Sequence, residues 1–189
     1  MEILKGLPVA QAINEELIKE SQEAGIKPHL AIIRVGERPD DCSYERGATK
    51  KMDKVGFDCT SYVFPQDITD EEFQKEFDKI NKDDNIDGIL LLRPLPKHIN
   101  EKAIEERINP VKDLDGISPV NLAKVYAGDV NGFAPCTAEA VIEMLDYAGI
   151  DLTGKRVTVV GRSLVIGKPV AMMLMGKNAT VTICHTKTK

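Results

Sequence analysis

Residues Lys155–His185, KRVTVVGRSLVIGKPVAMMLMGKNATVTICH, decide the fold of the second part of the chain. Val157–Val160 is a short run of apolar, mostly β-branched residues, the pattern of a buried strand. A helix is expected from Gly167 through Leu174, and a second strand at Ala179–Cys184. This order predicts a βαβ unit whose first turn directs backbone N–H groups and a helix N-terminus toward a bound anion.

That first turn contains two glycines, Gly161 and Gly167, with the spacing G-x-x-x-x-x-G. This spacing differs from the common dinucleotide fingerprint G-x-G-x-x-G. On spacing alone, a nucleotide site and a plain turn between packed elements are equally good interpretations. The residues after the second strand, 184–187, include no acid to bind ribose hydroxyls. Arg162 could take a phosphate in a bidentate fork, which favours NADP over NAD; a plain surface charge is the alternative.

Four segments together resemble the methylenetetrahydrofolate dehydrogenase/cyclohydrolase family. They are VVGRSLVIGKP at 159–169, NATVTICHTKT at 178–188, Pro135–Thr137 and Lys112–Gly116. The resemblance implies an N-terminal α/β folate-binding catalytic domain at residues 1–120. It also implies a Rossmann-like NADP-binding domain, whose hinge and first part occupy 121–189. Two parallel strands with one helix cannot bury both sheet faces, so this second domain is expected to be truncated in the sequence.

The resemblance also implies roles for particular residues. The expected cofactor-binding residues flank the ends of the two strands and are Gly161, Arg162, Ser163 and Thr186. The expected folate-binding residues are Tyr44, Pro94, Leu95, Pro96, Asp115 and Pro135. Tyr44 would otherwise be a half-buried tyrosine packed on the sheet, and turn aspartates such as Asp113 and Asp115 usually bond nearby backbone N–H groups. We favour the ligand role for Asp115 and the turn role for Asp113.

The sequence departs from the family at two positions. The general acid/base lysine expected four residues after Tyr44 is Ala48, and the glutamine of an LVQLPLP-like strand end is Leu92 in LLLRPLP. Neither side chain can transfer a proton or position a water molecule. Hydride transfer depends more on holding two rings face to face than on a proton carrier.

We therefore expect NADP-dependent oxidation of 5,10-methylenetetrahydrofolate to the 5,10-methenyl form, with cyclohydrolase activity weak or absent. Lys51 is one candidate to replace the missing lysine, and a solvated lysine is the alternative. The candidate catalytic residues are therefore Tyr44, Asp115 and Lys51. A catalytically silent folate-binding relative is the rival interpretation.

Alternating helical and strand patterns in the first 120 residues predict an α/β layer fold. Strands are expected at 30–35, 59–64 and 86–92, and helices at 7–24, after a Ser43 cap, and after a Thr69–Glu72 capping box. A loop-rich hinge and a helix capped by Thr137 are expected to follow. The cleft between the two domains is the expected ligand site.

Bulk properties restrict the possible partners. A formal net charge of −5, without a run dense in Lys and Arg, argues against a nucleic-acid surface. The sequence shows no signal peptide and no apolar stretch of membrane-spanning length, so a cytoplasmic protein without membrane contact is expected. Four scattered cysteines form no CxxC pair, which predicts reduced thiols and no metal site. By resemblance, the expected partners are tetrahydrofolate derivatives and a second copy in a homodimer.

Overall fold

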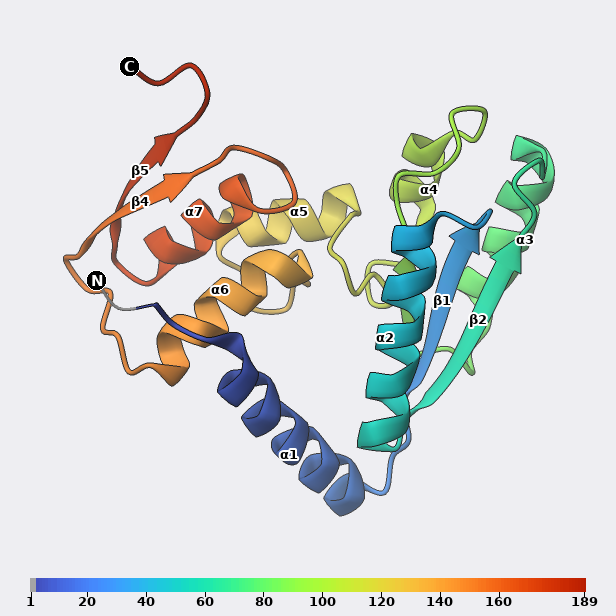
Figure 1. The fold of residues 1–189 in the computed structure, drawn as a ribbon, viewed down its shortest axis with the longest axis horizontal. Coiled ribbons are helices and arrows are strands. Elements are labelled where there is room, and N and C mark those ends of the chain that lie inside the picture. The colour runs from blue at the N-terminus through green and yellow to red at the C-terminus, as the bar shows by residue number, and fades with distance from the viewer. Residues whose placement is uncertain (1–2) are drawn as a thin grey trace. The chain divides into compact units, whose positions relative to one another are not determined.

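The structure, a computed structural model, describes residues 3–189, which form two compact units (Figure 1). The three-stranded unit is Asn14–Leu114, and the two-stranded unit combines the residues up to Ile13 with Asp115–Lys189. Helix α1 (Gly6–Ala24) contributes to both, and Gly25 follows it in a left-handed conformation. The domain limits expected from the sequence, 1–120 and 121–189, stay a prediction.

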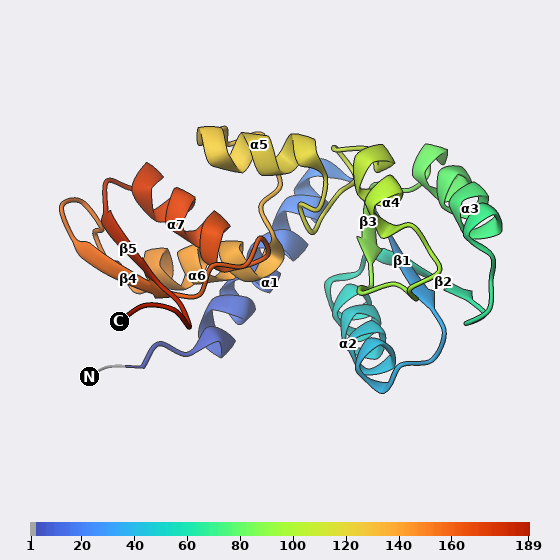
Figure 2. The same cartoon turned by 90° about the horizontal axis from the view of Figure 1, so that it is seen from above.

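The three-stranded unit contains a parallel sheet in the order β2-β1-β3. Its strands are β1 (His29–Val35), β2 (Asp58–Phe64) and β3 (Gly88–Leu91), and its further helices are α2 (Pro39–Val55), α3 (Asp70–Lys82) and α4 (Glu101–Arg107). Helix α2 lies on one face of the sheet, and α3 and α4 lie on the other (Figure 2). Strand β1 is buried along most of its length because it has a neighbour on each side and helices on both faces.

Helix starts in this unit show which sequence signals were informative. The capping box of α3 is confirmed: Thr69 Oγ1 accepts from Glu72 N at 3.2 Å, and Glu72 Oε2 accepts from Thr69 N at 3.2 Å. The expected Ser43 cap is wrong, because α2 already begins at Pro39. Proline is preorganised for the first turn of a helix, so the chain enters α2 four residues earlier.

The two-stranded unit confirms the βαβ pattern. Its elements are α5 (Pro119–Ala127), α6 (Cys136–Tyr147), β4 (Arg156–Val160), α7 (Gly167–Gly176) and β5 (Thr180–Cys184), with β4 and β5 parallel. The expected loop-rich hinge is wrong over 119–127, because α5 lies there, capped by Ser118. The expected Thr137 cap is also wrong: Pro135 occupies the N-cap of α6 and Thr137 lies within its first turn.

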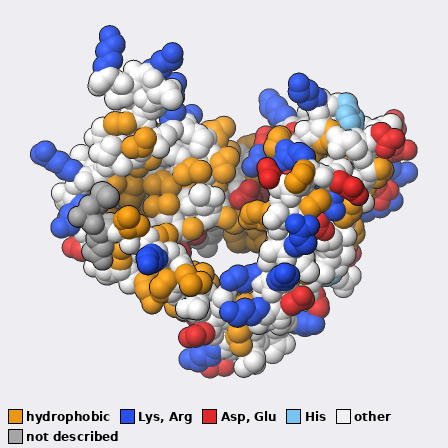
Figure 3. Space-filling model, in the orientation of Figure 1, with side chains coloured by type: hydrophobic (Ala, Val, Ile, Leu, Met, Phe, Trp, Pro, Cys, Tyr) orange, Lys and Arg blue, Asp and Glu red, His pale blue; other side chains and the backbone are white. Residues whose placement is uncertain are grey.

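The core of this unit lies on one face of its sheet. A cluster of buried residues from α6, α7 and the adjoining loops packs against Val157, Val159 and Val181. The expectation that Val157–Val160 is a buried strand is therefore wrong: alternate residues of β4 are exposed, and Val160 is 85% exposed, because the core covers only one face of this sheet. On the face drawn in Figure 3, hydrophobic side chains gather over the two-stranded unit, whereas charged side chains are numerous over α2. Within residues 3–189, no helix combines the length and the apolar character needed to span a membrane.

Candidate functional site

Tyr44 projects from α2 and is 57% exposed. The neighbouring Glu45 anchors the helix to the sheet, because its Oε2 atom accepts from Arg34 Nε on β1 at 2.6 Å and both side chains are nearly buried. This ion pair fixes the rotation of α2 and therefore the side of the helix on which Tyr44 emerges. Tyr44 thus offers an accessible aromatic face on a rigid element.

The two positions that depart from the family pattern meet in one apolar cluster. Leu92 is buried with Leu30 and Ile32, and Ala48 packs against them from α2. Met52, Cys59, Leu90 and Leu114 also pack against this cluster. A lysine and a glutamine would be adjacent polar groups at these positions, whereas here the same space is filled by side chains without polar atoms.

Lys51, the candidate replacement for the missing lysine, has its amine engaged elsewhere. Its Nζ atom donates to Oδ1 of the buried Asn14 on α1 at 3.1 Å. This hydrogen bond holds the ammonium group at α1. A catalytic role for Lys51 stays a prediction.

Asp115 lies where two segments of the two-stranded unit approach closely. Its Oδ1 atom accepts from Cys136 N at 3.4 Å, which brings Asp115 next to Pro135. Gly116 permits this approach: its φ is +59°, and a Cβ atom there would lie 2.5 Å from Phe133 O. Asp113 is only 1% exposed, and its backbone forms a bridge with Ile89; the turn role expected for its side chain stays a prediction.

Cys136 has a thiol rather than a thiolate at neutral pH. Although the residue as a whole is exposed, the surroundings of its sulfur are desolvated, and this desolvation together with the Asp115 carboxylate raises the pKa of Cys136 to about 11. A neutral thiol is a poor nucleophile. Cys136 therefore fits a role in shaping the loop around Asp115.

Lys112 begins the Lys-Asp-Leu-Asp-Gly segment and is not among the residues expected from the sequence to be functional. The residue is buried, and its Nζ atom donates to Asn81 O at 3.2 Å and to Asp83 O at 2.7 Å. These carbonyls belong to the C-terminal end of α3 and the residue that follows it, where a cation interacts favourably with the helix dipole. Lys112 therefore anchors the start of the segment that carries Asp115.

The glycine turn after β4 requires both of its glycines. Gly161 has a φ of +140° and donates its N–H to Cys184 O at 2.8 Å, which extends the pairing of β4 with β5. A Cβ atom on Gly167 would lie 2.3 Å from Gly161 O. The six-residue spacing thus lets the start of α7 press against the end of β4. Ser163 Oγ accepts from Ile166 N at 3.0 Å and from Gly167 N at 3.4 Å, so it satisfies two backbone amides at the entry to α7, whose N-cap residue is Ile166.

The four expected cofactor-binding residues lie at one edge of the two-stranded sheet. Gly161, Arg162 and Ser163 follow β4, while Thr186 follows β5, and parallel strands end at the same edge. Arg162 and Thr186 are both exposed. Thr186 lies in a turn closed by a bond from His185 N to Thr188 Oγ1 at 2.8 Å.

Electrostatics at this edge suit a phosphorylated ligand. Residues 152–189 contain no Asp or Glu. Of their cationic residues, Arg162, Lys168, Lys187 and Lys189 follow β4 or β5, whereas Lys155, Arg156 and Lys177 lie at or before the start of a strand, toward the opposite edge. Such a segment attracts anions, and the N-terminus of α7 adds its dipole at the glycine turn.

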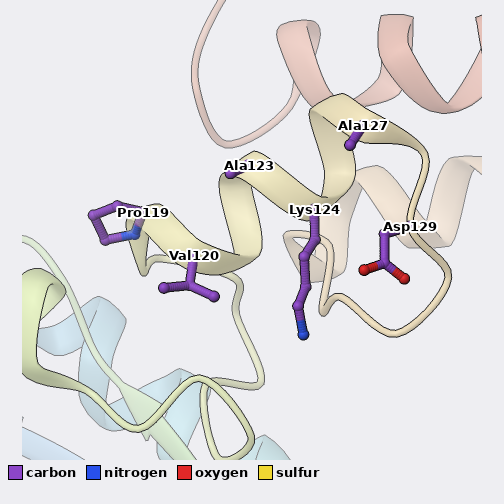
Figure 4. Close-up of a pocket in the computed structure, with 6 residues that line it drawn as sticks. All are labelled: Pro119, Val120, Ala123, Lys124, Ala127 and Asp129. Atoms are coloured by element: carbon purple, nitrogen blue, oxygen red, sulfur yellow. The ribbon is translucent and has the colours of Figure 1, made fainter.

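A separate cavity of about 520 Å³ runs along α5 (Figure 4). Its lining residues are Pro119, Val120, Ala123, Lys124, Ala127 and Asp129. None of them was expected to be functional from the sequence. This cavity lies along α5, the helix found where the sequence predicts a loop-rich hinge.

Residues 4–115 match the catalytic domain of tetrahydrofolate dehydrogenase/cyclohydrolase, and residues 135–189 match its NAD(P)-binding domain. The chain belongs to this family. Both the resemblance seen in the sequence motifs and the expected α/β fold with two domains are confirmed.

Curated members of this family are similar in sequence to this chain over nearly its whole length. The bifunctional protein FolD of Clostridioides difficile (strain 630) is 52% identical over 191 residues, which cover 100% of this chain and 67% of that protein. FolD of Clostridium kluyveri is 50% identical over 189 residues, covering 98% and 66%. The chain therefore spans about two thirds of the length of these curated relatives.

Solved structures give the same result. The bifunctional enzyme FolD from Campylobacter jejuni superposes with a TM-score of 0.95 at 37% identity, covering 100% of this chain and 68% of that one. The methylenetetrahydrofolate dehydrogenase-cyclohydrolase of Trypanosoma brucei, complexed with NADP cofactor and inhibitor, gives 0.89 at 36% identity, covering 99% and 65%.

Proposed function

We propose that the natural gene product containing this chain oxidises 5,10-methylenetetrahydrofolate to 5,10-methenyltetrahydrofolate with NADP as the hydride acceptor. Membership of the family supports the reaction class. The observation that carries the proposal for this chain is the glycine turn. The backbones of Gly161 and Gly167 lie so close together that a side chain on Gly167 would overlap Gly161, and the adjacent Arg162 is exposed. A homodimer and a cytoplasmic location stay predictions.

On the cofactor side, the chain supplies positioning and charge. Arg162 would bind the 2′-phosphate through its fork of N–H donors. Ser163 already accepts bonds from two backbone amides through Oγ, so its hydroxyl hydrogen would be directed at the ligand. Thr186 would close the site from the end of β5. The bound dinucleotide would supply the hydride-accepting ring.

On the folate side, Asp115 and Tyr44 would determine the orientation of the substrate. A carboxylate has about four lone-pair positions, so Asp115 can accept from the amino and ring N–H donors of a pterin in addition to the long bond from Cys136 N. The exposed ring of Tyr44 offers a face for stacking. The remaining contacts would come from Pro94, Leu95, Pro96 and Pro135.

We further propose that cyclohydrolase activity is weak. Opening the methenyl bridge needs an activated water molecule and a proton carrier. Ala48 and Leu92 place apolar packing where the family has a lysine and a glutamine, and the amine of Lys51 is bonded to Asn14. No group at these positions can carry the proton.

One observation favours a second candidate function, a catalytically silent folate-binding protein. The same apolar cluster replaces both halves of a catalytic pair, which is also what loss of all activity would leave. The two candidates differ at the glycine turn, because a silent relative has no need of NADP.

Separate assays of the natural gene product test these proposals. Reduction of NADP should depend on added 5,10-methylenetetrahydrofolate, and hydrolysis of methenyltetrahydrofolate should be near the uncatalysed rate. Folate binding without NADP reduction would favour the silent relative. Rapid hydrolysis that disappears in Lys51→Ala would assign the lost role to Lys51 and contradict the proposed loss.

A further inference from the structure

The segment Arg93–Pro96 leaves the sheet after a last backbone bond from Leu92 N to Ile33 O at 2.9 Å. Beyond that bond, the backbone of the segment is held by side chains. Arg38 Nη2 donates to Arg93 O at 3.1 Å, and Arg38 Nη1 donates to Pro94 O at 3.4 Å. Arg38 comes from the turn after β1, so the contact spans more than fifty residues of sequence.

The guanidinium of Arg38 is itself oriented by a buried carboxylate. Asp41 is nearly buried, and its Oδ1 atom accepts from Arg38 Nη2 at 2.6 Å. Nη2 therefore donates both to Asp41 on α2 and to the carbonyl of Arg93, while Nη1 reaches the next carbonyl, that of Pro94. A planar fork with several N–H donors can make these bonds at once, whereas a lysine ammonium cannot match the geometry.

A second set of charges holds the same segment from α4. Glu101 Oε2 accepts from Leu95 N at 2.8 Å. Arg93 Nη1 lies 3.0 Å from Glu105 Oε1 and 3.5 Å from Glu101 Oε1. Side chains therefore hold three consecutive residues, 93 to 95, through their backbone atoms. Arg93 stands where an LVQLPLP-like strand end has a leucine, so a charged group enters the network in this chain.

We propose that Arg38 is a positioning residue that sets the Pro94–Pro96 wall of the folate pocket and thereby the affinity for tetrahydrofolate derivatives. The inference rests on the proposed function, because that function makes the wall a folate contact. Arg38 acts through the carbonyls of Arg93 and Pro94 and need not contact the substrate. Its effect is specific to the folate side, since its bonds lie within the three-stranded unit.

The test compares Arg38→Met with Arg46→Met in the natural gene product. Arg46 is an exposed arginine on α2, the helix that begins directly after Arg38, and the structure gives no bond from Arg46 to the segment. Arg38→Met should raise the KM for 5,10-methylenetetrahydrofolate about tenfold, because bonds from a charged donor are lost. The KM for NADP should stay within about twofold of the wild-type value, as should both constants in Arg46→Met. Added guanidinium ion should partly restore the folate KM of Arg38→Ala.

The outcomes separate the inference from the proposed function. Wild-type protein that neither binds folate nor reduces NADP would overturn both. Active wild-type protein with Arg38→Met indistinguishable from Arg46→Met would overturn the positioning role alone, as would equal rises in the KM of folate and of NADP. If Arg38→Met does not fold, Arg38→Lys takes its place: an intermediate rise in the folate KM supports the role, and wild-type behaviour contradicts it.

Discussion

The glycine turn of the two-stranded unit and the apolar cluster under α2 relate to the family in opposite ways. The turn keeps every feature that a phosphorylated cofactor needs: close backbone approach, an exposed arginine and a segment without acids. The cluster contains Ala48 and Leu92 at the two positions where the family resemblance places the lysine and the glutamine of the hydrolysis reaction. If only the lysine or only the glutamine were replaced, the remaining polar group would be buried without its partner. That would cost more free energy than replacing both residues by apolar ones. From this difference we propose that the two activities of the family depend on separate parts of the chain.

The largest effect is expected from restoring the lost pair. The double variant Ala48→Lys/Leu92→Gln should increase hydrolysis of methenyltetrahydrofolate by about 100-fold or more, since positioned acid–base groups contribute roughly 10²–10⁴-fold. The measurement is the rate of methenyl loss. Leu92→Gln alone is the control: it should leave hydrolysis unchanged and lower the free energy of unfolding by about 1–3 kcal/mol, because its amide is buried without its partner. If the double variant hydrolyses methenyltetrahydrofolate no faster than the wild type, Ala48 and Leu92 are not the cause of the weak hydrolysis.

A smaller effect, at the other region, is expected from Gly167→Ala. The added Cβ would overlap Gly161 O, so either the turn or the start of α7 must move. Overpacking of this kind costs about 1–3 kcal/mol, and the Kd for NADP should rise by roughly 10- to 100-fold. Gly176→Ala is the matched control in the same helix, because nothing lies within 4 Å of its Cβ position. Calorimetric titration with NADP would measure both, and equal affinities would remove the glycine turn from the cofactor site.

Arg162→Gln tests the choice between NADP and NAD. The KM for NADP should rise about tenfold, the loss of one bond between charged groups, while the KM for NAD changes little. Arg156→Gln is a suitable control, because Arg156 is equally exposed but begins β4 rather than following it. Steady-state kinetics with both cofactors provide the comparison. A parallel rise for NAD and NADP would mean that Arg162 does not contact the 2′-phosphate.

The smallest effect concerns pH and Cys136. Because the pKa of its thiol is raised from 9.0 to about 11, Cys136 should be alkylated slowly by iodoacetamide at pH 8, and its rate should rise through about pH 11. The raised folded-state pKa also means that this group stabilises the fold below pH 9 and that the contribution is lost between about pH 9 and 11. Asp115→Asn removes a cause of the shift and should accelerate labelling several-fold at pH 8. Labelling at Cys136 is followed by mass spectrometry; an unchanged rate in that variant would place the carboxylate away from the thiol.

Local signals in the sequence predicted the local structure well. The capping box at Thr69–Glu72 and the strand–turn–helix–strand order of 156–184 depend on residues a few positions apart, and both are present. Helix α5 is also marked in the sequence, by Ser118 and Pro119 at its start and Gly128 at its end, although the prediction for this segment is a loop-rich hinge. These start and stop signals indicate a helix rather than a hinge.

Contacts between distant residues could not be predicted from the sequence. Lys112 closes the end of α3 from about thirty residues away, and Arg38 reaches Arg93 and Pro94 over a still longer separation. Periodicity carries no information about such pairs, because the fold alone brings them together. The same limit applies to Ala48 and Leu92: their departure from the family was readable, but their shared apolar cluster was not.

We propose that the natural gene product transfers hydride but hydrolyses methenyltetrahydrofolate weakly. The most direct test is the ratio of the two rates in one preparation of the natural gene product. With 5,10-methylenetetrahydrofolate and NADP, the account predicts that methenyltetrahydrofolate accumulates, because it forms faster than it is hydrolysed. Equally rapid formation of 10-formyltetrahydrofolate, with no accumulation of the methenyl form, would contradict it.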